Sequence, residues 1–222
     1  MFSIKRGDDR TIVELLASTL RRDIAFGALL PDQKLKIDEL RRRYGGSNHS
    51  MRETLRLLSA EGLVEATAQR GFRVTSDTED DLRDIQFVRI EIESIALTRA
   101  ISQGDVAWEG TVMAAHHSLQ RAETAVIETP DDLTALKWDE ACRAFSCSLI
   151  EACNSPRLID LHKKYFDQSR RFRLAQMREG KLDWTARKAR QKALLTAVLN
   201  RDSGAARALL KQEIEAELNT NK

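Results

Sequence analysis

The stretch from Ser47 to Leu58 constrains the fold of this chain more than any other part of the sequence. Its apolar residues recur at i, i+4 and i+7, at Met51, Leu55 and Leu58. Polar residues recur separately at i, i+4 and i+8, at Asn48, Arg52 and Arg56. Because side chains three or four residues apart share one side of an α-helix, each series lies on its own side. The stretch therefore predicts a short helix with an apolar face and a basic face.

The neighbouring residues predict where this helix begins and what precedes it. Ser50-Met51-Arg52-Glu53 fits the S-x-x-E capping box, so we expect the helix to begin between Ser47 and Ser50. Residues 37–44 predict another short helix, and Gly45-Gly46 separates the two. This arrangement is typical of a helix-turn-helix, whose second helix enters the DNA major groove. The alternative is a pair of surface helices with solvated arginines.

The residues after the second helix favour the helix-turn-helix. Residues 61–65 end the helix and open a strand, and residues 71–74 predict the returning strand. Residues 67–70 then form a hairpin loop between the two strands. A hairpin directly after a helix-turn-helix is a winged helix, so we expect this fold.

Residues 8–76 resemble the DNA-binding domain of GntR-type bacterial transcription regulators. The resemblance is carried, in order, by Phe26-Gly27 through Pro31, Leu35, Glu39-Leu40, Tyr44 to Ser47, Met51 to Leu55, Glu61 to Val64 and Arg70 to Val74. The chain departs from the family at Asp32, where a glycine is usual, and at Ser50, where a proline is usual. We expect the DNA contacts to come from Arg41, Ser47, Asn48, His49, Ser50, Arg52, Arg56 and Arg70.

Composition agrees with one DNA-binding domain and a second, helical domain. A chain of 222 residues suggests two domains, and helix formers dominate over its few aromatic residues. Residues 1–76 contain 14 Lys and Arg against 10 Asp and Glu, whereas residues 77–222 contain 22 against 24. A basic front half suits DNA binding by that half. No apolar run is long enough to span a membrane and no signal core is present, so we expect a cytoplasmic protein.

The second half predicts an antiparallel bundle of six or seven helices. Breaks at Gly104-Asp105, Pro130, Asn154-Ser155-Pro156, Gly180 and Arg201 to Gly204 separate the helical stretches. The expected helices cover about residues 78–102, 105–125, 130–153, 156–179, 184–200 and 205–218. The overall expectation is a mainly α chain, with a winged helix-turn-helix in residues 1–76 and an all-α effector-binding and dimerisation domain in residues 77–222.

Residues 80–217 resemble the effector-binding bundle of the FadR subfamily. The similar segments are Arg89 to Glu93, Phe145 to Asn154, and Ala193 to Asp202 with Ala205-Ala206. Many members of that subfamily bind a divalent metal through an Asp-x-x-x-His pair and two further histidines. The corresponding positions here are Cys142, Ser146, Gln191 and Glu213, and none is the usual residue. We therefore expect no metal and no cofactor, although Cys142 with Glu213 leaves a soft metal as an alternative.

The resemblance still implies an effector pocket. Its expected lining is Arg89, Cys142, Ser146, Gln191 and Glu213. A guanidinium at Arg89 matches a carboxylate, and the alternative is an ordinary surface pair of Arg89 with Glu93. A run of arginines at residues 170–178 predicts either a solvated face or a phosphate or acyl-group site. We interpret Cys142, Cys147 and Cys153 as small buried apolar residues rather than a disulfide framework.

Together these features predict a DNA-binding transcription regulator controlled by a small carboxylate or acyl effector. A single winged helix reads few bases, so we expect a homodimer on an inverted-repeat operator in double-stranded DNA. One alternative is a regulator whose bundle only dimerises and binds no ligand. Another is a helical-bundle enzyme, but the sequence shows no nucleophile with a base and no metal set, so we expect no catalytic residues.

Overall fold

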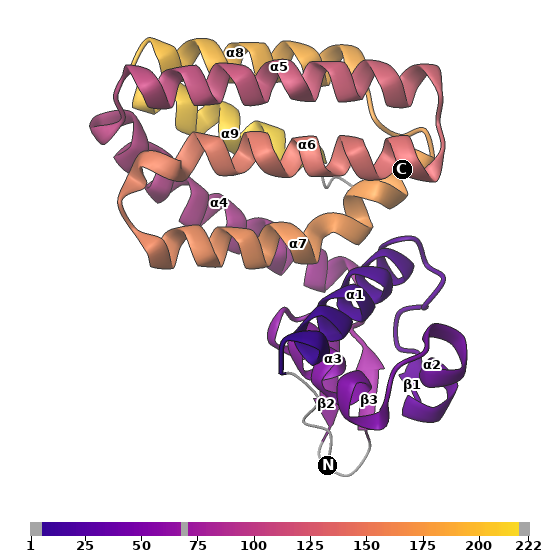
Figure 1. Cartoon of the computed structure of the whole chain (residues 1–222). Helices are drawn as coiled ribbons and strands as arrows, with labels where there is room; N and C mark the ends of the chain where they lie inside the picture. The colour runs from indigo at the N-terminus through magenta and orange to yellow at the C-terminus, as the bar shows by residue number, and fades with distance from the viewer. Residues whose placement is uncertain (1–5, 68–70, 218–222) are drawn as a thin grey trace. The chain divides into compact units, whose positions relative to one another are not determined.

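The computed structural model describes residues 6–67 and 71–217 (Figure 1). The chain divides into two compact units, Met1–Thr78 and Glu79–Lys222. None of the helices in the described ranges combines the length and the apolar run that a membrane crossing needs. The two units are described separately below.

The first unit combines helices with a small sheet. In chain order its elements are α1 (Arg6–Ala25), β1 (Lys34–Leu35), α2 (Ile37–Tyr44), α3 (Asn48–Ala60), β2 (Val64–Thr67) and β3 (Gly71–Val74). The sheet is antiparallel with the order β1-β3-β2, so β3 lies between the other two strands. Leu35 pairs with Phe72, and Val64 pairs with Val74. The winged helix-turn-helix predicted from the sequence is confirmed.

The apolar stripe of α3 lies at the centre of this unit's core. Met51, Leu55 and Leu58 are all fully buried. They belong to one cluster with Leu16 and Leu20 of α1. Burying a side chain of this size contributes about 1.5–3 kcal/mol, so the stripe fixes which side of α3 faces inward. The polar stripe of the same helix is left at the surface.

The N-terminus of α3 is capped by Ser47. Its Oγ accepts a hydrogen bond from the Ser50 backbone N–H at 3.0 Å, and Ser50 Oγ accepts one from the Ser47 N–H at 2.8 Å. The helix begins within the predicted range, but the predicted capping box of Ser50 with Glu53 is wrong. Glu53 instead pairs with Arg56 at 2.5 Å. Gly46 admits this cap, because its φ is +82° and a Cβ there would lie 2.9 Å from Ser50 Oγ.

The second unit is the expected helical bundle. Its elements are α4 (Glu79–Gln103), α5 (Val106–Glu128), α6 (Asp132–Ile150), the 3-10 turn η1 (Glu151–Cys153), α7 (Pro156–Arg178), α8 (Trp184–Leu199) and α9 (Ser203–Glu217). In Figure 1, α5 runs alongside α6 and α8, and it packs against both. α4 packs against α7 and α9. Pro156 at the start of α7 and side-chain caps at Asp105, Asp131, Ser155 and Asp183 explain the helix starts.

The buried side of α4 carries both apolar and charged residues. Leu82, Ile85 and Ala96 are buried, but Ile95 is 53% exposed. The side chains that share the buried stripe are instead Arg89 and Glu93, with exposures of 2% and 1%. Hydrophobicity alone misplaces the stripe, because it assigns charged residues to the surface. The buried Arg89 and Glu93 therefore form part of a polar interior in the bundle.

Candidate functional site

The exposed face of α3 carries the predicted polar side chains. Asn48, His49, Arg52 and Arg56 are exposed on it. Arg41 of α2 reaches this face, because its guanidinium donates to Asn48 Oδ1 at 3.1 Å and to the Gly46 carbonyl at 3.3 Å. Within residues 6–67 and 71–217, Arg52 makes no hydrogen bond or ion pair. Its guanidinium is therefore available to a binding partner.

Two further residues predicted to contact DNA are Ser50 and Arg70. Ser50 is only 2% exposed, and its hydroxyl is used by the cap with Ser47. The prediction that Ser50 contacts DNA is therefore wrong, because its side chain points into the domain. Ser47 remains exposed beside it. Arg70, which the sequence predicts at the tip of the hairpin, lies outside the described residues.

A small cavity inside the second unit brings together the residues predicted for the effector site. The volume open to the centres of water molecules is about 30 Å³. Among its lining residues are Arg89, Cys142, Ser146, Gln191 and Glu213. They come from α4, α6, α8 and α9, so segments far apart in the sequence meet at one point. The apolar part of the lining includes Leu119, Phe145, Phe166 and Ile214.

Arg89 is a buried residue with several partners. It donates to Glu93 Oε1 at 2.7 Å, to Glu217 Oε2 at 3.1 Å and to Ser169 Oγ at 3.1 Å. Its guanidinium also lies over the Phe166 ring, 4.7 Å from the centroid. Burial by itself lowers the pKa of Arg89, but Glu93 and Glu217 outweigh it and raise the pKa. The interpretation as a solvated surface pair is therefore wrong.

The arginine run on α7 is not a solvated face. Arg173 is fully buried and donates to Asp139, another fully buried residue, and to Ser169 Oγ at 3.1 Å. Arg170 donates to the other oxygen of the Asp139 carboxylate. Arg171 forms an ion pair with Asp81, and Arg178 forms one with Asp132. The run therefore connects α7 to α4 and α6, and of these four arginines only Arg178 is exposed.

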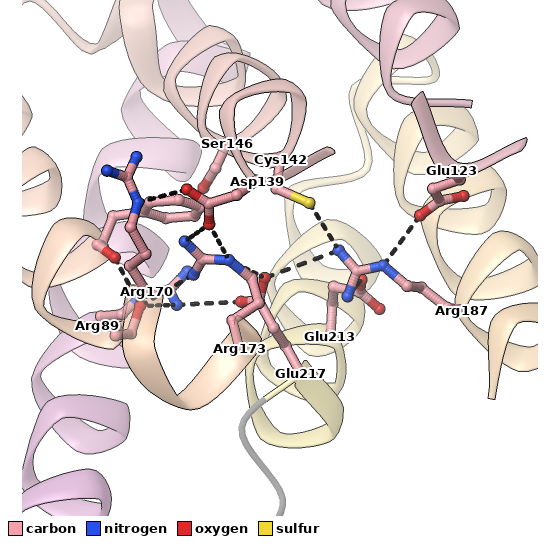
Figure 2. Close-up of polar contacts among 12 residues, drawn as sticks. Arg89, Glu123, Asp139, Cys142, Ser146, Arg170, Arg173, Arg187, Glu213 and Glu217 are labelled. Atoms are coloured by element: carbon pink, nitrogen blue, oxygen red, sulfur yellow. Dashed lines mark hydrogen bonds and ion pairs between the residues drawn. The ribbon is translucent and has the colours of Figure 1, made fainter. Parts of the chain in front are cut away.

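Arg187 of α8 also lines the cavity, and Figure 2 shows it on the opposite side of the labelled residues from Arg89. Its Nε donates to Glu123 Oε1 at 3.0 Å, and its Nη2 donates to Cys142 Sγ at 3.4 Å. Its Nη1 lies 3.1 Å from Glu213 Oε1, but the geometry is not that of a hydrogen bond, so this nitrogen has no acceptor in the part of the chain that the structure describes. The positive charge of Arg187 thus sits between residues from α5, α6 and α9.

Sequence reasoning missed Glu123, Asp139, Arg187 and Glu217. The signal for two of them was the helical period. Arg187 shares a buried stripe with Gln191 and Leu194, and Glu217 lies one further turn along the stripe of Leu210 and Glu213. A charged residue on an apolar stripe indicates a buried ion pair. Glu123 and Asp139 also lie on the buried sides of their helices.

The positions that correspond to metal ligands in the FadR subfamily do not fit a metal here. Burial raises the pKa of the Cys142 thiol, so the sulfur is held as a neutral thiol. Ser146 donates to Glu93 Oε2 at 3.4 Å, and Gln191 Nε2 donates to Glu123 at 3.1 Å and Glu213 at 3.3 Å. The guanidinium of Arg187 would also repel a second cation beside Cys142. Among the described residues, no group of three or more His, Cys, Asp or Glu side chains is arranged to hold a metal ion.

A histidine also joins this interior. His162 is fully buried, with Nε2 3.5 Å from Cys147 Sγ and Nδ1 3.2 Å from Glu93 Oε1. Burial lowers the pKa of His162, but Glu93 and Cys147 outweigh it and raise the pKa to about 9. The three cysteines are free; Cys142 and Cys153 are buried as interpreted, whereas Cys147 is partly exposed. His162 therefore adds a positive charge beside Glu93 at neutral pH.

Both halves of the chain match known sequence families. Residues 13–74 match the model of the gntR family of bacterial regulatory proteins, and residues 84–216 match the model of the FCD domain. An uncharacterised HTH-type transcriptional regulator, BphR, of Paraburkholderia xenovorans (strain LB400) is 34% identical over 94% of this chain and 84% of its own length. The HTH-type transcriptional repressor GlaR of Escherichia coli (strain K12) is 31% identical over 88% of this chain and 89% of its own.

Solved structures share the fold of the whole chain. Escherichia coli McbR/YncC superposes with a TM-score of 0.72 at 19% identity, covering 97% of this chain and 95% of that one. A putative transcriptional regulator GntR from Rhodococcus sp. RHA1 superposes with a TM-score of 0.71 at 21% identity, covering 95% and 99%. At these identities the likeness concerns the fold alone.

Proposed function

Because this chain belongs to the GntR family of bacterial regulatory proteins, we propose that α3 reads an operator and that a small carboxylate or acyl effector in the second unit controls this binding. The protein is a transcription regulator and not an enzyme. As a regulator of bacterial genes, it acts in the cytoplasm, where the DNA is. The observation that carries the DNA part is the exposed basic face of α3.

We assign the roles on this face by chemistry. Arg52 has a free guanidinium near the middle of the helix and reads guanine O6 and N7 in the major groove. Asn48 and His49, in the first turn, contact base edges or phosphates, together with Ser47 at the helix N-terminus. Arg41 on α2 and Arg56, one turn beyond Arg52 on α3, position the helix on the backbone. Arg70 at the hairpin tip contacts the backbone or minor groove.

We propose that the protein binds DNA as a homodimer on an inverted repeat. One winged helix contacts few base pairs, so two are needed for specificity in a genome. The second unit would contribute to the dimer interface. Light scattering at micromolar concentration should give the mass of two chains. A monomer that still binds a single half-site tightly would contradict this proposal.

The effector part of the proposal is carried by the buried arginines around the cavity. Arg89 and Arg187 both line it, and neither depends on a metal to present a positive charge. Guanidinium groups bind carboxylates through paired, charge-assisted hydrogen bonds. The effector is therefore held directly by side chains. Cys142, Ser146, Gln191 and Glu213 supply the neighbouring polar contacts.

The size of the cavity favours a second candidate, a bundle that only dimerises. A volume of about 30 Å³ holds on the order of two water molecules, so a ligand requires the lining to move. Thermal shifts of the full-length protein against small carboxylates and acyl thioesters, with and without chelator, separate the candidates. A saturable shift that survives chelator and weakens operator binding supports the effector proposal. No shift with any compound, together with unchanged operator binding, supports the dimerising bundle.

A further inference from the structure

One carboxylate in the bundle is shared by three buried arginines. Glu217 Oε2 accepts a hydrogen bond from Arg89 at 3.1 Å, while Oε1 lies 3.6 Å from Arg173 Nε and 3.7 Å from Arg187 Nη2. The arginines come from α4, α7 and α8, and Glu217 comes from the last turn of α9 (Figure 2). Glu217 itself is only 4% exposed. Burial raises its pKa, but Arg173, Arg89 and Arg187 outweigh burial and lower it, so the side chain is ionised.

Each of these arginines also has a carboxylate partner of its own. Arg89 is bonded to Glu93 at 2.7 Å, Arg173 to Asp139 at 2.8 Å and Arg187 to Glu123 at 3.0 Å. These bonds are shorter than any contact that Glu217 makes. We call these three arginines, their carboxylate partners and Glu217 the cluster. Glu217 is the carboxylate in it that no single arginine needs as its own partner, and it has the longest contacts. It can leave without depriving any arginine of its own partner.

The charge balance shows that the cluster still favours an anion after Glu217 leaves. The cations in the cluster or directly around it are Arg89, Arg170, Arg173, Arg187, Arg190 and His162. The carboxylates other than Glu217 are Glu93, Glu123, Asp139, Glu140 and Glu213. Without Glu217, cations outnumber carboxylates. In addition, the buried Arg187 Nη1, although 3.1 Å from Glu213 Oε1, has no hydrogen-bond acceptor within residues 6–67 and 71–217. Both features indicate a site for an incoming carboxylate.

We propose that Arg89, Arg173 and Arg187 form an anion site that Glu217 occupies as an internal placeholder, and that a carboxylate ligand binds by replacing it. This inference rests on the proposed effector function and specifies its regulation. Glu217 lines the cavity, so its departure enlarges the small space that is already present. The same departure releases the last turn of α9 from α4, α7 and α8. Ligand binding is thereby converted into a movement of one helix end.

Chemical rescue of the full-length protein tests the anion site without knowledge of the natural effector. Glu217→Ala removes the placeholder, and propionate, one methylene longer than the group removed, supplies a carboxylate that can occupy the gap and the adjoining cavity. We expect the variant to melt at a lower temperature than the wild type and propionate to raise its Tm to a plateau. Propionamide, which has the same shape without the charge, should give no such rise. The wild type should respond little, because Glu217 competes from within the chain.

Glu215→Ala is the matched control, since Glu215 is an exposed carboxylate on the same helix, 3.8 Å from Lys211. A propionate effect that is equal in Glu217→Ala, Glu215→Ala and the wild type would overturn the proposal. If Glu217→Ala does not fold, with or without propionate, the isosteric Glu217→Gln decides. We expect Glu217→Gln to melt clearly below the wild type. An unchanged Tm would show that the arginines do not need this anion, and the proposal would fall.

The outcomes also separate this inference from the effector function on which it rests. Rescue by propionate, with operator binding indifferent to every carboxylate, would leave the anion site standing and reject effector control. The reverse result, a carboxylate that weakens operator binding in the wild type without rescue of Glu217→Ala, would retain effector control. That result would place the ligand elsewhere than at Glu217 and overturn the inference.

Discussion

Single side chains in the second unit carry charge into places that the hydrophobic pattern assigns to the core. Arg89, Arg173 and Arg187 are each at most 3% exposed, and every one is paired with a carboxylate. A buried pair contributes little net stability compared with apolar residues, but removing one partner leaves an uncompensated charge. These residues are therefore sensitive to mutation whether or not a ligand binds.

Arg187→Ala should destabilise the second unit strongly. It strands Glu123 without its partner and removes the cation beside Glu213, and breaking a buried pair typically costs about 3–5 kcal/mol. Arg190→Ala is the control, because Arg190 pairs with the same Glu213 from a position that is 25% exposed. Its loss should cost about 0–1 kcal/mol. Denaturant unfolding measures both, and equal losses would contradict the buried network.

His162 should make the stability of the second unit depend on pH in the alkaline range. Its pKa is 6.5 when unperturbed and about 9 in the folded protein, so the folded state binds its proton more tightly. The resulting stabilisation is complete below about pH 6.5 and is lost as the pH rises through about 9. The free energy of unfolding of His162→Gln should therefore approach the wild-type value as the pH rises. The exposed His117→Gln serves as the control, and parallel pH curves for all three proteins would argue against a charged His162.

At the scale of elements, the helix-turn-helix was predictable because local signals agree with tertiary packing. Residues 37–44 form α2 as predicted, and the apolar stripe of α3 is buried along its length. The cap was less predictable, since Ser47 and Ser50 both precede an apolar stripe and both are good caps. Gly46 decides between them. Its positive φ allows the helix to begin directly after Ser47, three residues before a helix capped by Ser50 would begin.

A pair of substitutions distinguishes the two capping boxes. Ser47→Ala removes the acceptor for the Ser50 N–H and should cost about 1 kcal/mol of unfolding free energy. Glu53→Ala removes only an exposed pair with Arg56 and should change stability by about 0.5 kcal/mol or less. Denaturant unfolding of the full-length variants gives both values. A larger loss for Glu53→Ala would restore the cap predicted from Ser50 and Glu53.

The lining of the candidate effector site was predictable in part, but its chemistry was not. Similarity to the FadR subfamily points to Cys142, Ser146, Gln191 and Glu213, and these residues do line one cavity. The helical period marks Arg187 and Glu217 as buried, because each lies about one turn from a residue already identified, Gln191 and Glu213. Only the packing of α8 against α9 shows that the two side chains meet. The spacing of residues within one helix shows which of its sides is buried, but not which residues of another helix pack against that side.

At the scale of the whole molecule, we propose that the two units have different tasks. The first would present a basic helix to DNA, and the second would admit a carboxylate to its charged interior. The central claim is that α3 reads the operator. Because it concerns sequence preference and not only affinity, it requires a substitution on α3 and an equal loss of charge elsewhere.

The most direct measurement is DNA binding by full-length wild type, Arg52→Ala and Arg83→Ala, using a sequence selected by the wild type from random DNA. Arg83 is an exposed arginine on α4, paired with Glu79 and Asp80. We predict that Arg52→Ala weakens binding by about 1–3 kcal/mol per half-site and relaxes the preferred sequence, while Arg83→Ala leaves both unchanged. If Arg52→Ala keeps the wild-type affinity and the wild-type preference, α3 does not read the operator.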